Sequence, residues 1–234
     1  MRGDYSDSTI VMPTLNEEEN IGRIIAVITR MYPRISVIVS DDGSKDSTKR
    51  IVKGISAKNK RVRFFDRSAK KAHGNTTSVI DALPTVSTPK VIVMDADFQH
   101  PVKKVGEMLD ALDESDIVVG VRRGPGKRSF SRRFLSKGLI YLSLMVFKLR
   151  GFPTCGDMAS GFIGFKTSMI KKVISKNRDG YVGTGNKVLL DTLRMVDKNT
   201  KIAEVYYPNF PERERGKSKM SYKIIFLSLE SVFR

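Results

Sequence analysis

Two aspartates stand one residue apart, at Asp95 and Asp97, directly after the apolar run KVIVM that ends at Met94. In an extended segment, side chains two residues apart point to the same side, so both carboxylates can face one divalent cation. A solvated turn is the alternative, because aspartate is common wherever a strand stops. The spacing alone therefore leaves a metal site and an ordinary turn both open.

The elements around this pair favour a ligand site. Short apolar runs, typical of strands, alternate with segments of helical spacing, and this alternation predicts an open, mostly parallel α/β sheet flanked by helices. The polar segments PTLNE, DDGSKDS and DADFQHP follow the first, second and fourth expected strands. Ligands bind at the carboxyl ends of such strands, so we expect the three acidic loops to converge on one rim. The expected strands are 8–13, 35–40, 62–65, 90–94 and 116–121, and the expected helices are 21–28, 46–55, 76–83 and 105–112.

The charge of the chain indicates a polyanionic partner. Its formal net charge is +17, from 42 Lys and Arg against 25 Asp and Glu, and the segment 122–133 holds six basic residues and no acid. Nucleic acid, anionic lipid headgroups and phosphorylated small molecules all fit such a charge. Nucleic-acid binding predicts aromatic side chains among the basic ones, but only Phe130 lies in this segment and Trp is absent. We therefore expect no nucleic-acid partner.

The length and hydropathy of the chain predict one domain that does not cross a bilayer. The N-terminus lacks the apolar region of a signal peptide, and the longest apolar stretch, 138–147, is shorter than the roughly 20 residues that a membrane span needs. The single cysteine, Cys155, excludes an intrachain disulfide framework and fits a reducing cytoplasm. Amphipathic segments at 134–149 and 219–233 either pack on the sheet or bind an anionic membrane surface peripherally from the cytoplasmic side.

Five segments together resemble a known family. They occur in the order and at about the spacings of inverting family 2 glycosyltransferases of the GT-A (Rossmann-like) fold, and they are most similar to the branch of dolichol-phosphate mannose synthases and other polyprenyl-phosphate glycosyltransferases. This resemblance implies metal-dependent transfer of a hexose, mannose from GDP-mannose, to a polyprenyl (dolichyl) phosphate. The alternative is a related enzyme with another sugar or a non-lipid acceptor. The segments are PTLNEEENI, SDDGSKDST, VMDADFQHP, MASGF and RERGKSKM.

The resemblance also implies roles for individual residues. The metal, Mg²⁺ or Mn²⁺, would bind Asp95, Asp97 and Gln99. The nucleotide-diphosphate sugar would contact Asp95 and Asp97 and a pocket made by Pro13, Leu15, Glu17, Asp41 and Asp42. A phosphate monoester is already anionic near neutral pH, so its attack needs cations to hold it rather than a general base. The residues expected to carry the reaction are Asp97, Arg122, Arg132, Ser136, Arg213 and Lys219.

Some positions depart from the family pattern, and one histidine is expected to have a structural role. Leu15 stands where the family usually has Tyr, and KKAHGNTTSV replaces the usual Lys-Gly-Leu-Gly run. Ile163 and Ala159 replace an Arg and a Thr. We expect His100 to shape the turn into the next helix rather than act as a base, because no carboxylate partner for its ring is evident in the sequence.

The resemblance finally suggests how the chain is divided. We expect a GT-A catalytic domain over 1–215 and a C-terminal amphipathic helix over 216–234. Within the catalytic domain, a donor half covers about 1–121 and a half that faces the acceptor and the membrane covers about 122–215. Many relatives continue into transmembrane helices, so a membrane-protein partner remains among the expectations.

Overall fold

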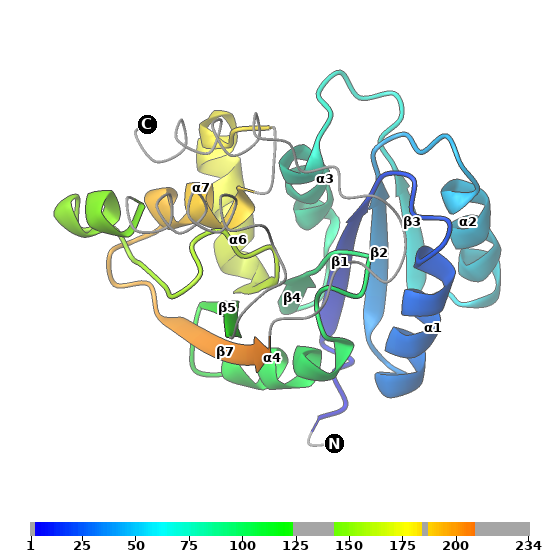
Figure 1. The fold of residues 1–234 in the computed structure, drawn as a ribbon, viewed down its shortest axis with the longest axis horizontal. Helices are drawn as coiled ribbons and strands as arrows, with labels where there is room; N and C mark the ends of the chain where they lie inside the picture. The colour runs from blue at the N-terminus through cyan, green and yellow to red at the C-terminus, as the bar shows by residue number, and fades with distance from the viewer. Residues whose placement is uncertain (1–2, 124–142, 184–186, 209–234) are drawn as a thin grey trace.

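The computed structural model describes residues 3–123, 143–183 and 187–208. These residues form a seven-stranded sheet with helices on both faces (Figure 1). The strand order is β3-β2-β1-β4-β6-β5-β7. The strands are β1 Ser8–Thr14, β2 Ser36–Asp41, β3 Val62–Asp66, β4 Lys90–Val93, β5 Ile117–Arg123, β6 Ile163–Lys166 and β7 Ile202–Pro208.

The helices fall into two groups, one on each face of the sheet. In the described part of the chain the numbered α-helices are α1 Ile21–Met31, α2 Thr48–Lys58, α3 Asn75–Ala82, α4 Val105–Ala111, α6 Thr167–Asn177 and α7 Val188–Met195, and residues 143–149 are helical as well. The described residues also form three single 3₁₀ turns, which are η1 Leu83–Thr85, η2 Val102–Lys104 and η3 Arg178–Gly180. Figure 1 shows α3, α6 and α7 together on one face, with α1, α2 and α4 on the other.

Each group of helices closes its own hydrophobic core. In α1, four isoleucines at helical spacing form the buried stripe and pack with α4 against the sheet. The opposite core is filled by apolar residues of α3, α6 and α7. Strands β1 and β2 are buried almost throughout, as expected for strands covered on both faces. The predicted open, mostly parallel α/β sheet is therefore confirmed.

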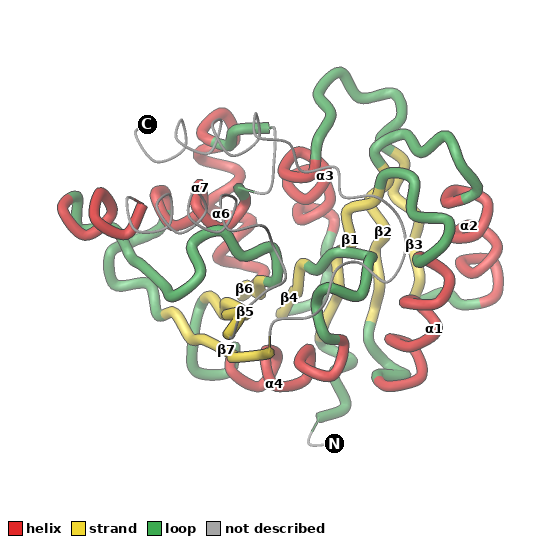
Figure 2. Tube along the Cα trace, in the orientation of Figure 1, coloured by secondary structure: helices red, strands yellow, loops and turns green. Residues whose placement is uncertain are grey.

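The direction of the strands decides which loops meet. Strand β1 pairs in parallel with β2 and β4, so the carboxyl ends of all three lie at one edge. Strand β6 is antiparallel to both β4 and β5, so β4 and β5 run in the same direction. Strand β7 is parallel to β5. The residues after β5 and before β6 therefore lie at the same edge. Figure 2 shows the loops after β1, β2 and β3 together at one end of the strands.

Several sequence predictions concern residues that the structure does not describe. These are most of the basic segment 122–133, the first part of the amphipathic segment 134–149, and the C-terminal helix 216–234. The described end of the first amphipathic segment is helical over 143–149. No helix among the described residues is long and apolar enough to span a bilayer.

Candidate active site

The ends of β1 and β2 form the first wall of the site. Thr14 pairs with Asp41 across the two strands, and the Thr14 hydroxyl donates to Asp41 Oδ2 at 3.1 Å. The backbone N–H groups of Gly43 and Ser44 donate to Asp41 Oδ1 at 3.2 and 2.9 Å. Gly43 has a φ of +90°, a conformation that suits glycine and lets both N–H groups face the carboxylate. Asp41 is thus fixed by its own turn.

Asp42 belongs to a buried ion cluster. Arg67 reaches the Oδ1 of Asp42 with Nη1, and its Nε donates to Asp81 Oδ2 at 2.9 Å. The Arg67 side chain is only 1% exposed. Its remaining N–H groups donate to Ser78 Oγ at 2.9 Å and to the carbonyl of Ala72 at 2.8 Å. Every charge here has a partner, as burial requires.

The same carboxylate of Asp42 also anchors the next loop. His73 Nδ1 lies 3.1 Å from Asp42 Oδ1, and the N–H of Gly74 donates to Asp42 Oδ2 at 2.7 Å. This loop belongs to the segment KKAHGNTTSV, where the sequence departs from the pattern of the family that it resembles. In the described structure, Asp42 therefore shapes the wall of the site from within.

The paired aspartates differ in their surroundings. Asp97 is 1% exposed, and its Oδ1 accepts the N–H of Gln99 at 3.0 Å. Asp95 is partly exposed. Phe98 between Asp97 and Gln99 has a φ of +64°, which is rare for a bulky residue, and the guanidinium of Arg23 lies 5.4 Å from its ring centroid. The loop is therefore a tight, locally strained turn.

His100 ends this turn from the buried side. Its Nδ1 accepts the backbone N–H of Asp95 at 2.9 Å, and its Nε2 lies 3.8 Å from Asp95 Oδ2. Burial lowers the pKa of His100 to about 4, although Asp97 acts in the opposite direction. The imidazole is neutral near pH 7, and the hydrogen bond to Asp95 is what a turn-shaping role predicts.

A cation near the end of β5 lies at the same edge of the sheet as the paired aspartates. The Nε of Arg122 donates to Asp157 Oδ2 at 3.2 Å. Burial opposes the charged form of Arg122, but Asp157, with Tyr207 and Asp95 nearby, leaves its pKa raised. Tyr207 lies opposite Arg122 in the β5–β7 ladder, and burial raises the pKa of its phenol. The edge of the sheet thus combines a fixed positive charge with the acidic loop.

The other expected nucleoside contacts lie at the end of β1. Pro13 is buried in the strand, whereas Leu15 is 38% exposed just beyond it. Glu17 is buried, and its Oε2 accepts from the side chain of Asn20 at 3.1 Å. An exposed apolar side chain beside a fixed acid can contact a nucleoside, which is compatible with the role that the sequence suggested.

The donor set at the paired aspartates fits Mg²⁺ or Mn²⁺. Carboxylate and amide oxygens are hard ligands, and Mg²⁺ is often bound by one or two carboxylates together with substrate phosphates and water. Asp95, Asp97 and Gln99 share one short loop. No group of three or more His, Cys, Asp or Glu side chains that could hold a metal occurs in the described part of the chain. A cation here would therefore depend on oxygen ligands from its substrate.

The structure brings together only part of the predicted site. Pro13, Thr14, Asp41, the paired aspartates and Arg122 lie along one edge of the sheet. Sequence reasoning missed Arg67, Asp81 and Tyr207 as neighbours of the site, since each is a single residue outside any motif. Four predicted residues lie outside the described part: Arg132, Ser136, Arg213 and Lys219.

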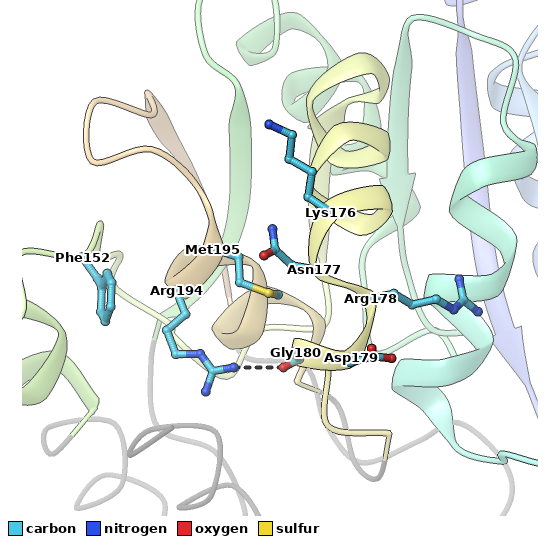
Figure 3. A pocket seen from close by; sticks show the side chains of 8 residues that line it. All are labelled: Phe152, Lys176, Asn177, Arg178, Asp179, Gly180, Arg194 and Met195. Atoms are coloured by element: carbon cyan, nitrogen blue, oxygen red, sulfur yellow. Dashed lines mark hydrogen bonds between the residues drawn. The ribbon is translucent and has the colours of Figure 1, made fainter.

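A separate pocket of 440 Å³ lies at the carboxyl end of α6 (Figure 3). In Figure 3 Arg194 donates to the carbonyl of Gly180, a bond of 2.9 Å, and Arg178 points away from the pocket. Arg178 instead pairs with Asp81 on α3. None of the predicted site residues lines this pocket, so it is distinct from the strand-end site.

Comparison with known proteins identifies the family. The family model described as "Glycosyl transferase family 2" matches residues 9–177, which is most of the chain. The chain therefore belongs to glycosyl transferase family 2.

Two curated relatives extend over almost the whole chain. One, from Pyrococcus furiosus, is named dolichol-phosphate mannosyltransferase, and it is 30% identical over 234 residues, covering 97% of this chain and 62% of the relative. Another, from Mycolicibacterium smegmatis, is named polyprenol monophosphomannose synthase, and it is 27% identical over 220 residues, covering 91% of this chain and 80% of the relative. The chain thus spans less than two thirds of the Pyrococcus relative.

Solved structures show the same fold at lower identity. Glucosyl-3-phosphoglycerate synthase from Mycobacterium tuberculosis, in complex with Mn²⁺, UDP-glucose and phosphoglyceric acid, has a TM-score of 0.69 and 18% identity. The match covers 96% of this chain and 78% of that one. This likeness supports a GT-A fold.

Proposed function

We propose that the protein is a metal-dependent, inverting glycosyltransferase that moves mannose from GDP-mannose to a polyprenyl (dolichyl) phosphate. The observation that carries the proposal is the meeting of opposite charges at one edge of the sheet. There the acidic loop after β4 and Arg122 near the end of β5 lie at the same edge, and Asp95 is among the groups that raise the pKa of Arg122. A metal-bound diphosphate and a phosphate acceptor need such a division of charge. The names of the two curated relatives support mannose and a lipid phosphate.

On the donor side, the strand ends supply a preformed nucleoside wall. Asp41 is fixed by four hydrogen bonds, from the Thr14 and Ser44 hydroxyls and two backbone N–H groups. Leu15 adds an exposed apolar surface. A wall whose side chains are already ordered loses little conformational entropy when a ligand binds. We propose that Pro13, Leu15 and Glu17 contact the nucleoside, while Asp41 and Asp42 keep the wall rigid.

A divalent cation would be held by Asp95, Asp97 and Gln99. When bound, Mg²⁺ or Mn²⁺ would neutralise the charge of the diphosphate and stabilise it as the leaving group. The protein contributes the orientation of the two carboxylates. The carboxylate of Asp97 is oriented by the hydrogen bond from the Gln99 N–H. The backbone of Asp95 is held by its hydrogen bond to His100.

On the acceptor side, Arg122 binds the phosphate monoester. The bidentate geometry of guanidinium suits a phosphate, and Asp157 keeps this group oriented from the buried side. One phosphate oxygen attacks the anomeric carbon while the bond to the diphosphate breaks, and the departing oxygen takes the bonding electrons. No proton moves in this displacement, and it inverts the anomeric centre. Arg132, Ser136, Arg213 and Lys219 complete the proposed phosphate contacts.

Access to a lipid acceptor requires a membrane surface. In the helical residues 143–149, Met145 and Leu149 are 55% and 80% exposed and stand four residues apart, on one side of the helix. Lys148 and Arg150 are exposed beside them. Apolar insertion combined with attraction to anionic headgroups is the usual basis of stable peripheral binding. We propose peripheral attachment to the cytoplasmic face of a membrane, alone or with a membrane-protein partner.

The direct test is a transfer assay. The protein is incubated with labelled nucleotide sugars, Mg²⁺ or Mn²⁺ and a polyprenyl phosphate, and label is measured in the organic phase. The proposal expects label from GDP-mannose, loss of label with EDTA, and inversion at the anomeric carbon. Label from another sugar would correct the donor. Label transferred only to a soluble acceptor would favour the alternative family 2 function.

Paired arginine variants test the division between donor and acceptor. Arg122→Gln should lower transfer roughly ten- to hundredfold, because a charge-assisted hydrogen bond contributes about 1.5–3 kcal/mol. Binding of GDP with Mn²⁺ should change little. Arg123→Gln is the matched control, since Arg123 is exposed and lies against the ring of Tyr206, 3.5 Å from its centroid. Equal losses of transfer and of GDP binding in Arg122→Gln would contradict the proposed division between donor and acceptor sites.

A further inference from the structure

Three aromatic side chains connect β7 with the loop of paired aspartates. Tyr207 and Phe162 meet edge to face, with ring centroids 5.9 Å apart and planes at 75°. Phe162 and His100 then stack, with centroids 5.1 Å apart and planes only 9° apart. All three residues are buried. A continuous contact thus leads from a strand at the edge of the sheet to the residue that ends the acidic turn.

His100 is the last member of this row, and it contacts Asp95 at two points. Its Nδ1 accepts the Asp95 backbone N–H at 2.9 Å. Because Nδ1 is the acceptor, a neutral ring carries its proton on Nε2, which faces Asp95 Oδ2 at 3.8 Å. One ring therefore fixes the backbone of Asp95 and places an N–H group on the side of its carboxylate.

The turn itself needs such support. Phe98 has a φ of +64°, and a left-handed conformation costs a bulky residue free energy that surrounding contacts must offset. Two contacts hold the residues around Phe98. The Gln99 N–H donates to Asp97 at 3.0 Å, and the guanidinium of Arg23 lies over the Phe98 ring. At the start of the turn, the hydrogen bond from the Asp95 N–H to His100 Nδ1 joins its two ends. Without it, Asp95 would lose its fixed direction relative to Asp97.

We propose that His100 is a positioning residue that fixes Asp95 through Nδ1, and that Phe162 and Tyr207 hold its ring for this purpose. The inference deepens the proposed function, because Asp95 is one of the oxygen ligands assigned above to the cation. His100 acts through Asp95 and takes no proton from the acceptor.

The packing around Phe162 shows how closely the ring is placed. Its carbonyl accepts the N–H of Gly120 on β5 at 2.8 Å. A Cβ added to Gly120 would lie 2.7 Å from Phe162 Cδ1, a distance too short for two carbon atoms. Glycine at this position therefore lets the Phe162 ring pack closely against β5 while it stacks on His100.

Two conservative substitutions separate positioning from base catalysis. The side-chain oxygen of asparagine lies at about the reach of Nδ1, whereas that of glutamine lies at about the reach of Nε2. His100→Asn can therefore keep the acceptor for the Asp95 N–H, and His100→Gln cannot. A base that works through Nε2 predicts that neither amide rescues activity, because amides do not accept protons near neutral pH.

The first measurement needs no metal or substrate. Amide hydrogen exchange at Asp95 is followed by NMR in protein treated with EDTA. His100→Gln should speed exchange at this amide about tenfold or more, while His100→Asn should stay close to wild type, because exchange reports local opening of this hydrogen bond. Unchanged exchange in His100→Gln, or equal acceleration in both variants, would overturn the inference.

The aromatic support is tested by a matched pair. Phe162→Leu removes the stacking partner of His100 and should speed exchange at Asp95. Phe152→Leu removes one ring of the Phe147–Phe152 pair, centroids 5.4 Å apart, on the other side of the sheet, and should leave Asp95 unaffected. Equal effects of the two would mean that general loss of stability, rather than the aromatic row, explains the change. This pair also keeps the inference testable if His100→Gln does not fold.

Titration with Mn²⁺ distinguishes failure of the inference from failure of the proposed function. In wild type and His100→Asn, Mn²⁺ should bind with similar affinity. In His100→Gln it should bind about tenfold more weakly, because Asp95 would lose the hydrogen bond to His100 that holds it in place for the cation. If exchange follows this order but wild type binds no Mn²⁺, the positioning role stands and the metal assignment fails. If wild type binds Mn²⁺ and His100→Gln binds it equally well, the metal assignment stands and the positioning role fails.

Discussion

Arg67 is the residue on which the order of the donor wall depends. It lies between Asp42 and Asp81, whose side chains are 6% and 11% exposed. Removing one partner of a buried ion pair leaves an uncompensated charge, and here two carboxylates would lose their shared cation. The cluster therefore links the end of β2 with α3 and with the loop 67–74 that precedes α3.

A comparison of two arginines on Asp81 tests this dependence. Arg67→Ala should lower the free energy of unfolding by about 3–5 kcal/mol. Arg178→Ala removes the other cation of Asp81, but Arg178 is 54% exposed, so its loss should cost less than about 1 kcal/mol. Urea unfolding followed by circular dichroism measures both. Similar losses in the two variants would mean that burial does not set the importance of Arg67.

Asp97 should matter for activity and little for stability. Asp97→Asn keeps a side-chain oxygen for the Gln99 N–H and removes one negative charge from the acidic loop. Because nearby acids repel one another without a cation, we expect the free energy of unfolding to stay the same or rise slightly. Transfer should be nearly lost at any metal concentration. A thermal melt and the transfer assay check the two parts, with Cys155→Ser as a control. Wild-type turnover in Asp97→Asn would remove the metal assignment.

At this scale the sequence could predict motifs but not their neighbours. The paired aspartates and the acidic loops are local patterns, so their place at the ends of β1, β2 and β4 followed from the alternation of elements. Arg67 and Tyr207 come near the site only through strand pairing and packing between distant segments. Nothing in their local sequence separates them from a surface arginine or a core tyrosine.

At the scale of elements, β6, β7, α6 and α7 were not predicted from the sequence, and β6 is the strand whose direction is hardest to predict from local patterns. The first five strands and the first four helices were predicted close to their observed bounds, because each shows its own periodicity. Strand β6 runs antiparallel between β4 and β5. Its position depends on pairing with strands far away in the sequence. The short run IGFK carries no signal for that direction.

Gly164 explains how β6 fits between its neighbours. A Cβ at this position would lie 2.5 Å from Ile92 Cδ1 and 2.7 Å from Val118 Cγ1, on the two adjoining strands. Gly164→Ala should therefore destabilise the protein by about 1–3 kcal/mol through overpacking. Gly54→Ala in α2 is the matched control, since nothing lies within 4 Å of its added Cβ. It should stabilise by about 0.4–1 kcal/mol. Thermal melts of both variants give the signs, and equal signs would contradict this account of the packing.

At the scale of the whole molecule, charge and exposed apolar surface predict how the protein meets a membrane. The net charge of +17 attracts anionic headgroups over a distance that salt shortens to about 8 Å at physiological ionic strength. Met145 and Leu149 provide an exposed apolar side on helical residues 143–149. Attraction and insertion depend on different properties of the surface, so they can be separated.

Vesicle sedimentation separates them. Wild type should bind vesicles that contain anionic lipid, and binding should weaken as salt rises, because exposed charges are screened. The double variant Met145→Ser/Leu149→Ser keeps every charge, so its binding should weaken at all salt concentrations while the dependence on salt stays the same, since apolar insertion is the part removed. Val146→Thr, on a partly buried position of the same segment, is a control for changes in the helix itself. Equal binding of wild type to neutral and anionic vesicles would show that charge does not direct attachment. Unchanged binding of the double variant would show that this helix does not enter the membrane surface.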